Sequence, residues 1–248
     1  MTSEINEINV QEILKQYQII NTIKEDDNLI KYIIKKIDTE ILCVMTITTK
    51  GNYKLFKQLK KCDYLNINKI IEVEKIPDGK IVIIEDYMED AQTLRYHIEN
   101  NMSINNFEDV LLQICDALIY LLSLKTPITY NNINIDNIII CDDNVVKIIN
   151  FEKADFNANS KKDIKMFGEL INNSGDKYAK KYRKIIKDCK DVYQTPSEIQ
   201  KAINASRRIL GVKYSLLVLI GIIMMVLLRF GWGFVRTGGI LRNIMNNR

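Results

Sequence analysis

The sequence is poor in histidine, proline and paired cysteine, and the shortage of histidine and paired cysteine excludes classes of protein. Its 248 residues include one histidine, His97, and three prolines. The five cysteines are odd in number, and none stands at CxxC spacing. A zinc site needs several Cys or His ligands at short spacing, so we expect no metal site. Unpaired thiols are typical of a reducing compartment rather than of a secreted, disulfide-bonded chain.

A basic stripe interleaved with aromatic residues is missing as well. The net charge is +4, and Lys and Arg are interspersed with Asp and Glu through most of the chain. That pattern is typical of a solvated surface, so we expect no nucleic-acid partner. Apolar residues make up 47% and charged residues 27% of the chain. This composition indicates a globular protein, long enough for one medium domain or two small ones.

One long uncharged run occurs near the C-terminus. Tyr214 to Leu228 carries no charge, and the apolar character resumes after Arg229 up to Val235. About 20 apolar residues cross a bilayer core, so Tyr214 to Val235 predicts a transmembrane helix if Arg229 can reach the headgroups. A buried core helix is the alternative. Because the N-terminus is acidic and polar, unlike a signal peptide, we predict a single-pass membrane protein with a cytoplasmic N-terminal domain.

The first third of the chain is rich in β-branched runs separated by polar turns. These runs predict five strands, and they cover residues 19–20, 30–34, 41–47, 67–75 and 80–87. Between the third and fourth runs, residues 52–61 place Leu55, Phe56 and Leu59 at helical spacing. One helix is therefore expected after the third strand.

Helical spacing dominates after residue 88. It predicts helices over residues 93–100, 106–124, 161–172, 177–190 and 196–205. Between them, two short apolar runs, 135–141 and 145–149, are separated by Asp142-Asp143-Asn144. Two such runs around a polar turn predict a β-hairpin.

The central stretch of the chain resembles the protein kinase family. Residues 128–154, ITYNNINIDNIIICDDNVVKIINFEKA, are similar to the kinase catalytic loop, its following hairpin and the metal-binding motif. Residues 130–132, Tyr-Asn-Asn, stand where kinases have His-Arg-Asp. Asn137 matches the catalytic-loop Asn, and residues 150–152, Asn-Phe-Glu, stand where kinases have Asp-Phe-Gly.

Flanking residues extend the resemblance over residues 17–205. Glu85 and Tyr87 resemble the kinase hinge, and Asp163 and Gly168 resemble the start of the large C-lobe helix. The resemblance implies an α+β, compact bilobal fold, and the apolar run Tyr214 to Val235 adds one transmembrane helix after it. The expected parts are an arm (1–16), a five-stranded N-lobe with one helix (17–88), a reduced helical C-lobe (89–205), a juxtamembrane and transmembrane segment (206–236) and a short basic tail (237–248).

Residues that kinases use for phosphoryl transfer are missing from this alignment. Residues 24–28, between the first two strands, have three acids and no glycine to approach a phosphate. The third strand has no lysine, with Met45 the best-aligned position, and the helix over 52–61 has no acid. Asn132 replaces the catalytic base and Asn150 the metal-binding carboxylate. An amide cannot accept a proton at neutral pH, and it is a weak ligand for Mg²⁺.

The resemblance therefore implies a catalytically inactive scaffold with a vestigial nucleotide pocket. That pocket would contain Asn137, Asn150, Glu85 and Tyr87, and neither ATP nor Mg²⁺ is expected as a cofactor. The architecture is similar to bacterial membrane pseudokinases such as the EssB/YukC component of type VII secretion, without their extracytoplasmic domain. Protein partners in a membrane complex are expected from that similarity. The partner, the pathway and the oligomeric state stay open.

Two other hypotheses compete with the inactive scaffold. The first is a divergent but active membrane-bound Ser/Thr kinase, which would use Asp136, Asp142, Asp143 or Asp155 in place of the lost carboxylates. The second is a tail-anchored α+β binding protein that is unrelated to kinases.

Overall fold

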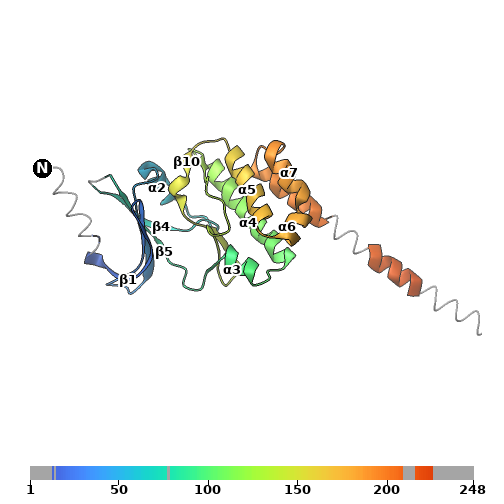
Figure 1. Ribbon diagram of the computed structural model, residues 1–248, viewed down its shortest axis with the longest axis horizontal. Coiled ribbons are helices and arrows are strands. Elements are labelled where there is room, and N and C mark those ends of the chain that lie inside the picture. Colours follow the sequence, from blue (N-terminus) through green and yellow to red (C-terminus); the bar gives the residue numbers. More distant parts are fainter. Residues whose placement is uncertain (1–12, 14, 77–78, 209–215, 226–248) are drawn as a thin grey trace, which may run out of the picture. The chain divides into compact units, whose positions relative to one another are not determined.

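The computed structural model describes residues 13, 15–76, 79–208 and 216–225. The chain divides into two compact units, Met1–Gln200 and Lys201–Arg248. The first unit contains a five-stranded antiparallel sheet in the order β1-β2-β3-β5-β4 (Figure 1). Its strands are β1 (Tyr17–Asp26), β2 (Leu29–Lys36), β3 (Leu42–Thr48), β4 (Ile70–Lys75) and β5 (Ile81–Asp86). The predicted α+β class and the five predicted strands are confirmed.

Alternation along the strands gives the sheet two different faces. On one face Tyr17, Ile34, Met45 and Ile84 pack with Ile13 into a buried apolar cluster. The opposite face carries Lys31 of β2, which pairs in register with Thr46 of β3. Because side chains alternate with a period of two, the face that a residue occupies follows from its register.

One helix follows the third strand, as the sequence predicts. Helix α2 (Tyr53–Leu59) buries Leu55, Phe56 and Leu59 and packs against β4. Its N-cap is Asn52, whose side-chain oxygen accepts hydrogen bonds from the backbone N–H groups of Lys54 (3.0 Å) and Leu55. An Asn at this position satisfies two of the backbone donors that a helix start leaves unpaired.

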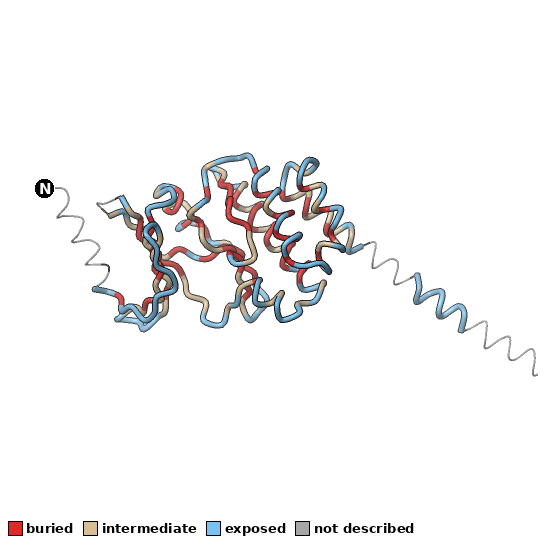
Figure 2. The backbone as a smooth tube through the Cα atoms, in the orientation of Figure 1, coloured by how far each residue is buried: buried red, intermediate tan, exposed pale blue. Residues whose placement is uncertain are grey.

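The remainder of the first unit is mainly helical (Figure 1). The helices are α3 (Leu94–Glu99), α4 (Ile104–Ser123), α5 (Lys161–Asn173), α6 (Asp176–Lys181) and α7 (Arg183–Asp191). The long helix α4 buries an apolar stripe that includes Leu111, Ile114 and Leu118. Buried (red) stretches of the tube in Figure 2 lie in this helical part of the unit. Residues 196–200 are also helical.

A single helix over residues 177–190 is a wrong prediction, because the chain leaves the helical conformation at Tyr182. That residue separates α6 from α7 with φ −101° and ψ 19°. Its side chain is buried, and its hydroxyl donates a 2.6 Å hydrogen bond to Glu108 on α4. The break is therefore one residue long, at a side chain that is anchored against another helix, and periodicity alone does not reveal it.

Short strands form two further small sheets in the first unit. The predicted hairpin is confirmed as β8 (Ile138–Ile140) and β9 (Val146–Ile148), and β6 (Gln92–Thr93) adds a third strand to it. β7 (Ile128–Thr129) pairs with β10 (Asp155–Phe156). The backbone N–H of Ile148 also donates to Asn66 in the chain leading to β4, at 3.0 Å. The Ile148 pairing connects β9, which precedes the loop around residues 149–154, to the segment that leads into the large sheet.

The predicted transmembrane helix, Tyr214 to Val235, is not supported. Residues 216–225 form a helix with every residue exposed, while residues 214–215 and 226–235 lie outside the described residues. A helix over 216–225 extends about 15 Å, half of the roughly 30 Å of a bilayer core. Nowhere in the described ranges is a helix both long and apolar enough to cross a membrane. On that finding the transmembrane helix and the single-pass membrane location with its cytoplasmic domain are wrong predictions.

Candidate functional site

A cleft of about 610 Å³ lies between the sheet and the loops that follow β7 and β9. The sheet contributes residues of β1 and β2, among them Lys31, and Thr48 at the end of β3. The loops contribute Asn132 and Asn137 from one segment and Asn150 and Glu152 from the other. Three residues that the sequence singles out, the asparagines, therefore line one cavity.

The three asparagines are joined by hydrogen bonds. The side-chain amide of Asn132 donates to the backbone carbonyl of Asn150 at 2.7 Å. The amide of Asn150 donates to Oδ1 of Asn137 at 2.7 Å, and the amide of Asn137 donates to the carbonyl of Asn132 at 2.9 Å. Each amide group is thus used as a donor inside the network. Asn150 adopts a left-handed backbone conformation (φ 66°), which Asn tolerates better than most residues.

Lys31 is a cleft residue that sequence reasoning missed. Its Nζ lies 3.0 Å from Oε1 of Glu152, and the two side chains are only 11% and 13% exposed. The same ammonium also donates a short hydrogen bond to Oδ1 of Asn150. The resemblance places a lysine on the third strand, whereas the structure supplies one from β2. The available signal was alternation, because Lys31 shares its strand face with Leu29 and Ile33.

Glu85 of β5 belongs to the same charged cluster. It is buried, and its pKa is raised to about 7. Burial is the largest cause, the ammonium of Lys31 lowers the pKa, and the carboxylate of Glu152 raises it. Asn68 also lowers this pKa through a hydrogen bond to the carboxylate. Two acids and one lysine therefore share a poorly solvated region, where ionised groups are stable only when paired.

Asp163 of α5 fixes the loop that carries Asn132. Its two carboxylate oxygens accept hydrogen bonds from the backbone N–H groups of Tyr130 (2.9 Å) and Asn131 (2.6 Å). Asp163 is 2% exposed, and its burial raises its pKa while both N–H donors lower it. The hydroxyl of Tyr130 in turn donates to the backbone carbonyl of Ile149. One buried carboxylate and one phenol thus hold both loops of the cleft in place.

The carboxylates considered as replacements for catalytic acids have other contacts. Asp136 forms a two-pronged ion pair with Arg95 of α3, with distances of 2.6 and 2.8 Å. Asp143 accepts a hydrogen bond from the backbone N–H of Val145 in the hairpin turn. Asp155 lies in the short strand β10 and is exposed. Of these, only Asp136 lines the cleft.

Two predicted site residues lie elsewhere. Met45 is buried on the opposite face of the sheet, in the apolar cluster with Ile34 and Ile84. Tyr87 lines a separate hollow beside the hairpin turn, together with Met88 and Asp142. The structure brings Asn132, Asn137 and Asn150 together, and Lys31 interacts both with Asn150 and with the nearby Glu85. Met45 and Tyr87 lie away from this group.

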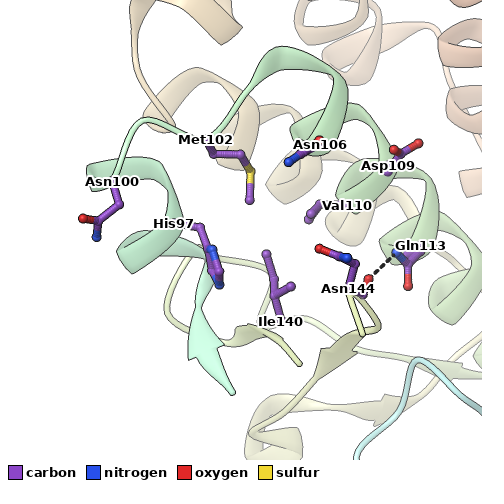
Figure 3. A pocket seen from close by; sticks show the side chains of 9 residues that line it. All are labelled: His97, Asn100, Met102, Asn106, Asp109, Val110, Gln113, Ile140 and Asn144. Atoms are coloured by element: carbon purple, nitrogen blue, oxygen red, sulfur yellow. Dashed lines mark hydrogen bonds between the residues drawn. The ribbon is translucent and has the colours of Figure 1, made fainter. Parts of the chain in front are cut away.

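Another hollow, of about 330 Å³, lies between α3, α4 and the β8–β9 turn (Figure 3). Met102 and Ile140 contribute apolar walls, and Gln113 donates a 3.0 Å hydrogen bond to the carbonyl of Asn144 at its edge (Figure 3). His97 also lines it, and the Nε2 atom of this histidine is buried without a hydrogen-bond partner among the described residues. None of the residues predicted for the functional site lines this hollow.

In the cleft, the Lys31–Glu152 pair lies beside Asn132, Asn137 and Asn150, and these asparagines stand where the resemblance puts phosphoryl-transfer groups. Asn132 offers no carboxylate to accept a proton, and the side-chain oxygen of Asn150 already accepts from Lys31. In the described part of the chain, no group of three or more His, Cys, Asp or Glu side chains could hold a metal ion. Comparison of the chain with models of protein families and with curated proteins found no match to either.

Proposed function

We propose that the first unit of this chain is a protein-kinase-like domain that does not transfer phosphate and acts by binding another protein. The observation that carries the proposal is the position of the Lys31 ammonium. It contacts the carboxylate of Glu152 and the side-chain oxygen of Asn150, the position that the resemblance assigns to a metal ligand. A protein cation stands where a bound Mg²⁺ would need oxygen ligands.

The fold features that support kinase kinship are the sheet, the position of α2 and the motif loops. The sheet has five antiparallel strands with one helix between β3 and β4. The two loops that resemble the catalytic loop and the metal-binding motif meet through Asn132 and Asn150. Asp163, which the resemblance places at the start of the large C-lobe helix, anchors the first of these loops.

Chemistry supports the loss of phosphoryl transfer. A catalytic base must take the proton of the attacking hydroxyl, and the amide of Asn132 has no basic atom for it. That amide also donates a hydrogen bond to the backbone carbonyl of Asn150, and this bond holds the side chain of Asn132 in place. The ammonium of Lys31, which could otherwise offset part of the charge of a triphosphate, is already paired with the carboxylate of Glu152.

Thermal unfolding with and without ligand tests the proposal. A ligand present at a hundred times its Kd stabilises the native state by about 2.7 kcal/mol, which is several degrees in Tm. We expect no shift of the wild-type chain with ATP and Mg²⁺. We expect Lys31→Met to lower the Tm and Mg²⁺ alone to restore part of that loss, since the variant frees the oxygens of Glu152 and Asn150. Lys35→Met is the control. It removes another lysine of β2, one that pairs with Glu40, and it should show no rescue by Mg²⁺.

A divergent, active kinase is the second candidate, and one observation favours it. Lys31 and Glu152 provide a lysine and a carboxylate in the cleft, although from positions that kinases do not use. In that case ATP with Mg²⁺ would stabilise the wild type, Lys31→Met would abolish the shift, and labelled phosphate would be transferred to protein. That set of results would replace the first candidate with the second.

A further inference from the structure

Most of the charges that line the cleft cancel in pairs. Lys24 pairs with Asp26, and Lys31 pairs with Glu152, each with 3.0 Å between nitrogen and oxygen. The third acid of the lining pairs with Arg95 of α3. Every carboxylate of the lining therefore already has a cation beside it.

Two further lysines of the lining, Lys50 and Lys153, have no ion-pair partner among the described residues. Lys50 lies in the bend between β3 and α2, Lys153 ends the 3-10 turn η1 (Phe151–Lys153), and both are exposed. The two segments adjoin at Gly51, where an added Cβ would lie 3.5 Å from the carbonyl oxygen of Glu152. Gly51 has φ 102°, a conformation that favours glycine. The fold thus brings two unpaired cations to the cleft on adjoining segments.

A hydrogen-bond acceptor lines the same cleft. The side-chain nitrogen of Asn132 donates to the carbonyl of Asn150, whereas its Oδ1 atom accepts no hydrogen bond from the described residues. A ligand that suits the cleft therefore combines an anionic group for the lysines with a donor for this oxygen. A peptide with Asp or Glu side chains offers both, because its backbone supplies N–H groups. An inorganic polyphosphate supplies the charge without them.

We propose that the cleft binds an acidic segment of a partner protein, with a carboxylate between Lys50 and Lys153 and a backbone N–H that donates to Asn132. The inference rests on the proposed function, because it names the surface by which the domain binds another protein. A cleft of about 610 Å³ accommodates a few residues of an extended chain. Since both lysines are exposed, their contacts stay partly in water, and the affinity should fall as salt is added.

Fluorescence polarisation with the full chain tests the proposal. The probe is a fluorescein-labelled peptide of three glutamates flanked by serine and glycine. We expect saturable binding that Lys50→Glu and Lys153→Glu each weaken about tenfold, since each change replaces an attraction with a repulsion. Lys125→Glu is the matched control, because it changes the net charge equally at an exposed lysine outside the cleft lining. It should bind the peptide as the wild type does, and all three variants should keep the wild-type Tm.

Competition with sodium triphosphate separates a peptide site from a phosphate site. Unlabelled peptide should displace the probe at a lower concentration than triphosphate does. Tighter binding of triphosphate, no binding of the peptide by the wild type, or an equal loss in Lys125→Glu would each overturn the proposal. The proposed function fails by a different result, stabilisation of the wild type by ATP with Mg²⁺, so the two failures can be told apart.

Discussion

The ammonium of Lys31 lies 3.0 Å from the carboxylate of Glu152, and this contact joins the five-stranded sheet to the loop after β9. Both side chains are nearly buried. The buried carboxylate of Glu85 interacts electrostatically with both of them. A pair in this setting has little access to water, so the loss of one member leaves a charge that solvent cannot stabilise.

Lys31→Met should therefore lower the free energy of unfolding by about 2–4 kcal/mol. Replacing both charges, Lys31→Met with Glu152→Leu, should cost less than Lys31→Met alone, because the carboxylate of Glu152 is then not left without its partner and no longer repels Glu85. Urea unfolding of the three proteins measures these differences. An effect below about 0.5 kcal/mol for Lys31→Met, the level of an ordinary surface substitution, would mean that the pair is not formed in solution.

Arg95→Ala should have a much smaller effect, although its ion pair with Asp136 has better geometry. The side chains of Arg95 and Asp136 are 48% and 54% exposed, so water screens the pair. We expect a loss of about 0.2–1 kcal/mol that falls further in high salt. Urea unfolding at two salt concentrations measures it. A loss as large as that of Lys31→Met would contradict the view that burial decides the strength of these pairs.

Glu85→Gln should change how stability depends on pH. The folded-state pKa of Glu85 is about 7 against an ordinary value of 4.5, so the native state holds this proton more tightly than the unfolded chain. The resulting stabilisation is fully present below pH 4.5 and is lost as the pH rises through about 7. The wild type should therefore lose about 3 kcal/mol relative to Glu85→Gln between pH 4.5 and pH 8.

Unfolding of both proteins across that pH range provides the measurement. Glu89→Gln, which changes an exposed carboxylate after β5, should follow the wild-type profile. Parallel profiles for the wild type and Glu85→Gln would show that Glu85 ionises normally.

Asp163→Ala should be one of the most destabilising single substitutions in the chain. It leaves the backbone N–H groups of Tyr130 and Asn131 without their acceptor, and each unsatisfied buried donor costs about 1–3 kcal/mol. We expect a loss of about 3 kcal/mol or more, and a smaller loss for Asp163→Asn, which keeps one acceptor oxygen. Thermal and urea unfolding can rank the two variants. Equal, small losses would show that the loop is held by other contacts.

The sequence predicts the sheet well because its signals are local. Runs such as Ile30 to Ile34 combine β-branched residues with polar turns on each side, and they form strands as expected. The short pair β7 and β10 is missed, because two-residue strands leave no periodic pattern. The break at Tyr182 is missed for a different reason, since it depends on a hydrogen bond to Glu108 on a distant helix.

The site is only partly predictable for the same physical reason. Asn132, Asn137 and Asn150 meet because the motif spacing is preserved across a hairpin. Lys31 precedes Asn150 by 119 positions in the sequence. Their contact depends on how the sheet packs against the loops that carry the asparagines. Met45 shows the limit of alignment on a strand, since an error of one position moves a side chain to the other face.

The Lys31–Glu152 contact also restricts motion. Opening the cleft by a hinge rotation would separate the sheet from the loop after β9, and it would pull the ammonium away from its two oxygen partners. The two parts of the first unit should therefore fluctuate as one body on fast timescales. Amide hydrogen exchange in the loop around Asn150 should accelerate in Lys31→Met before the protein unfolds globally. A substitution within one strand would then loosen the connection between the sheet and the loop after β9.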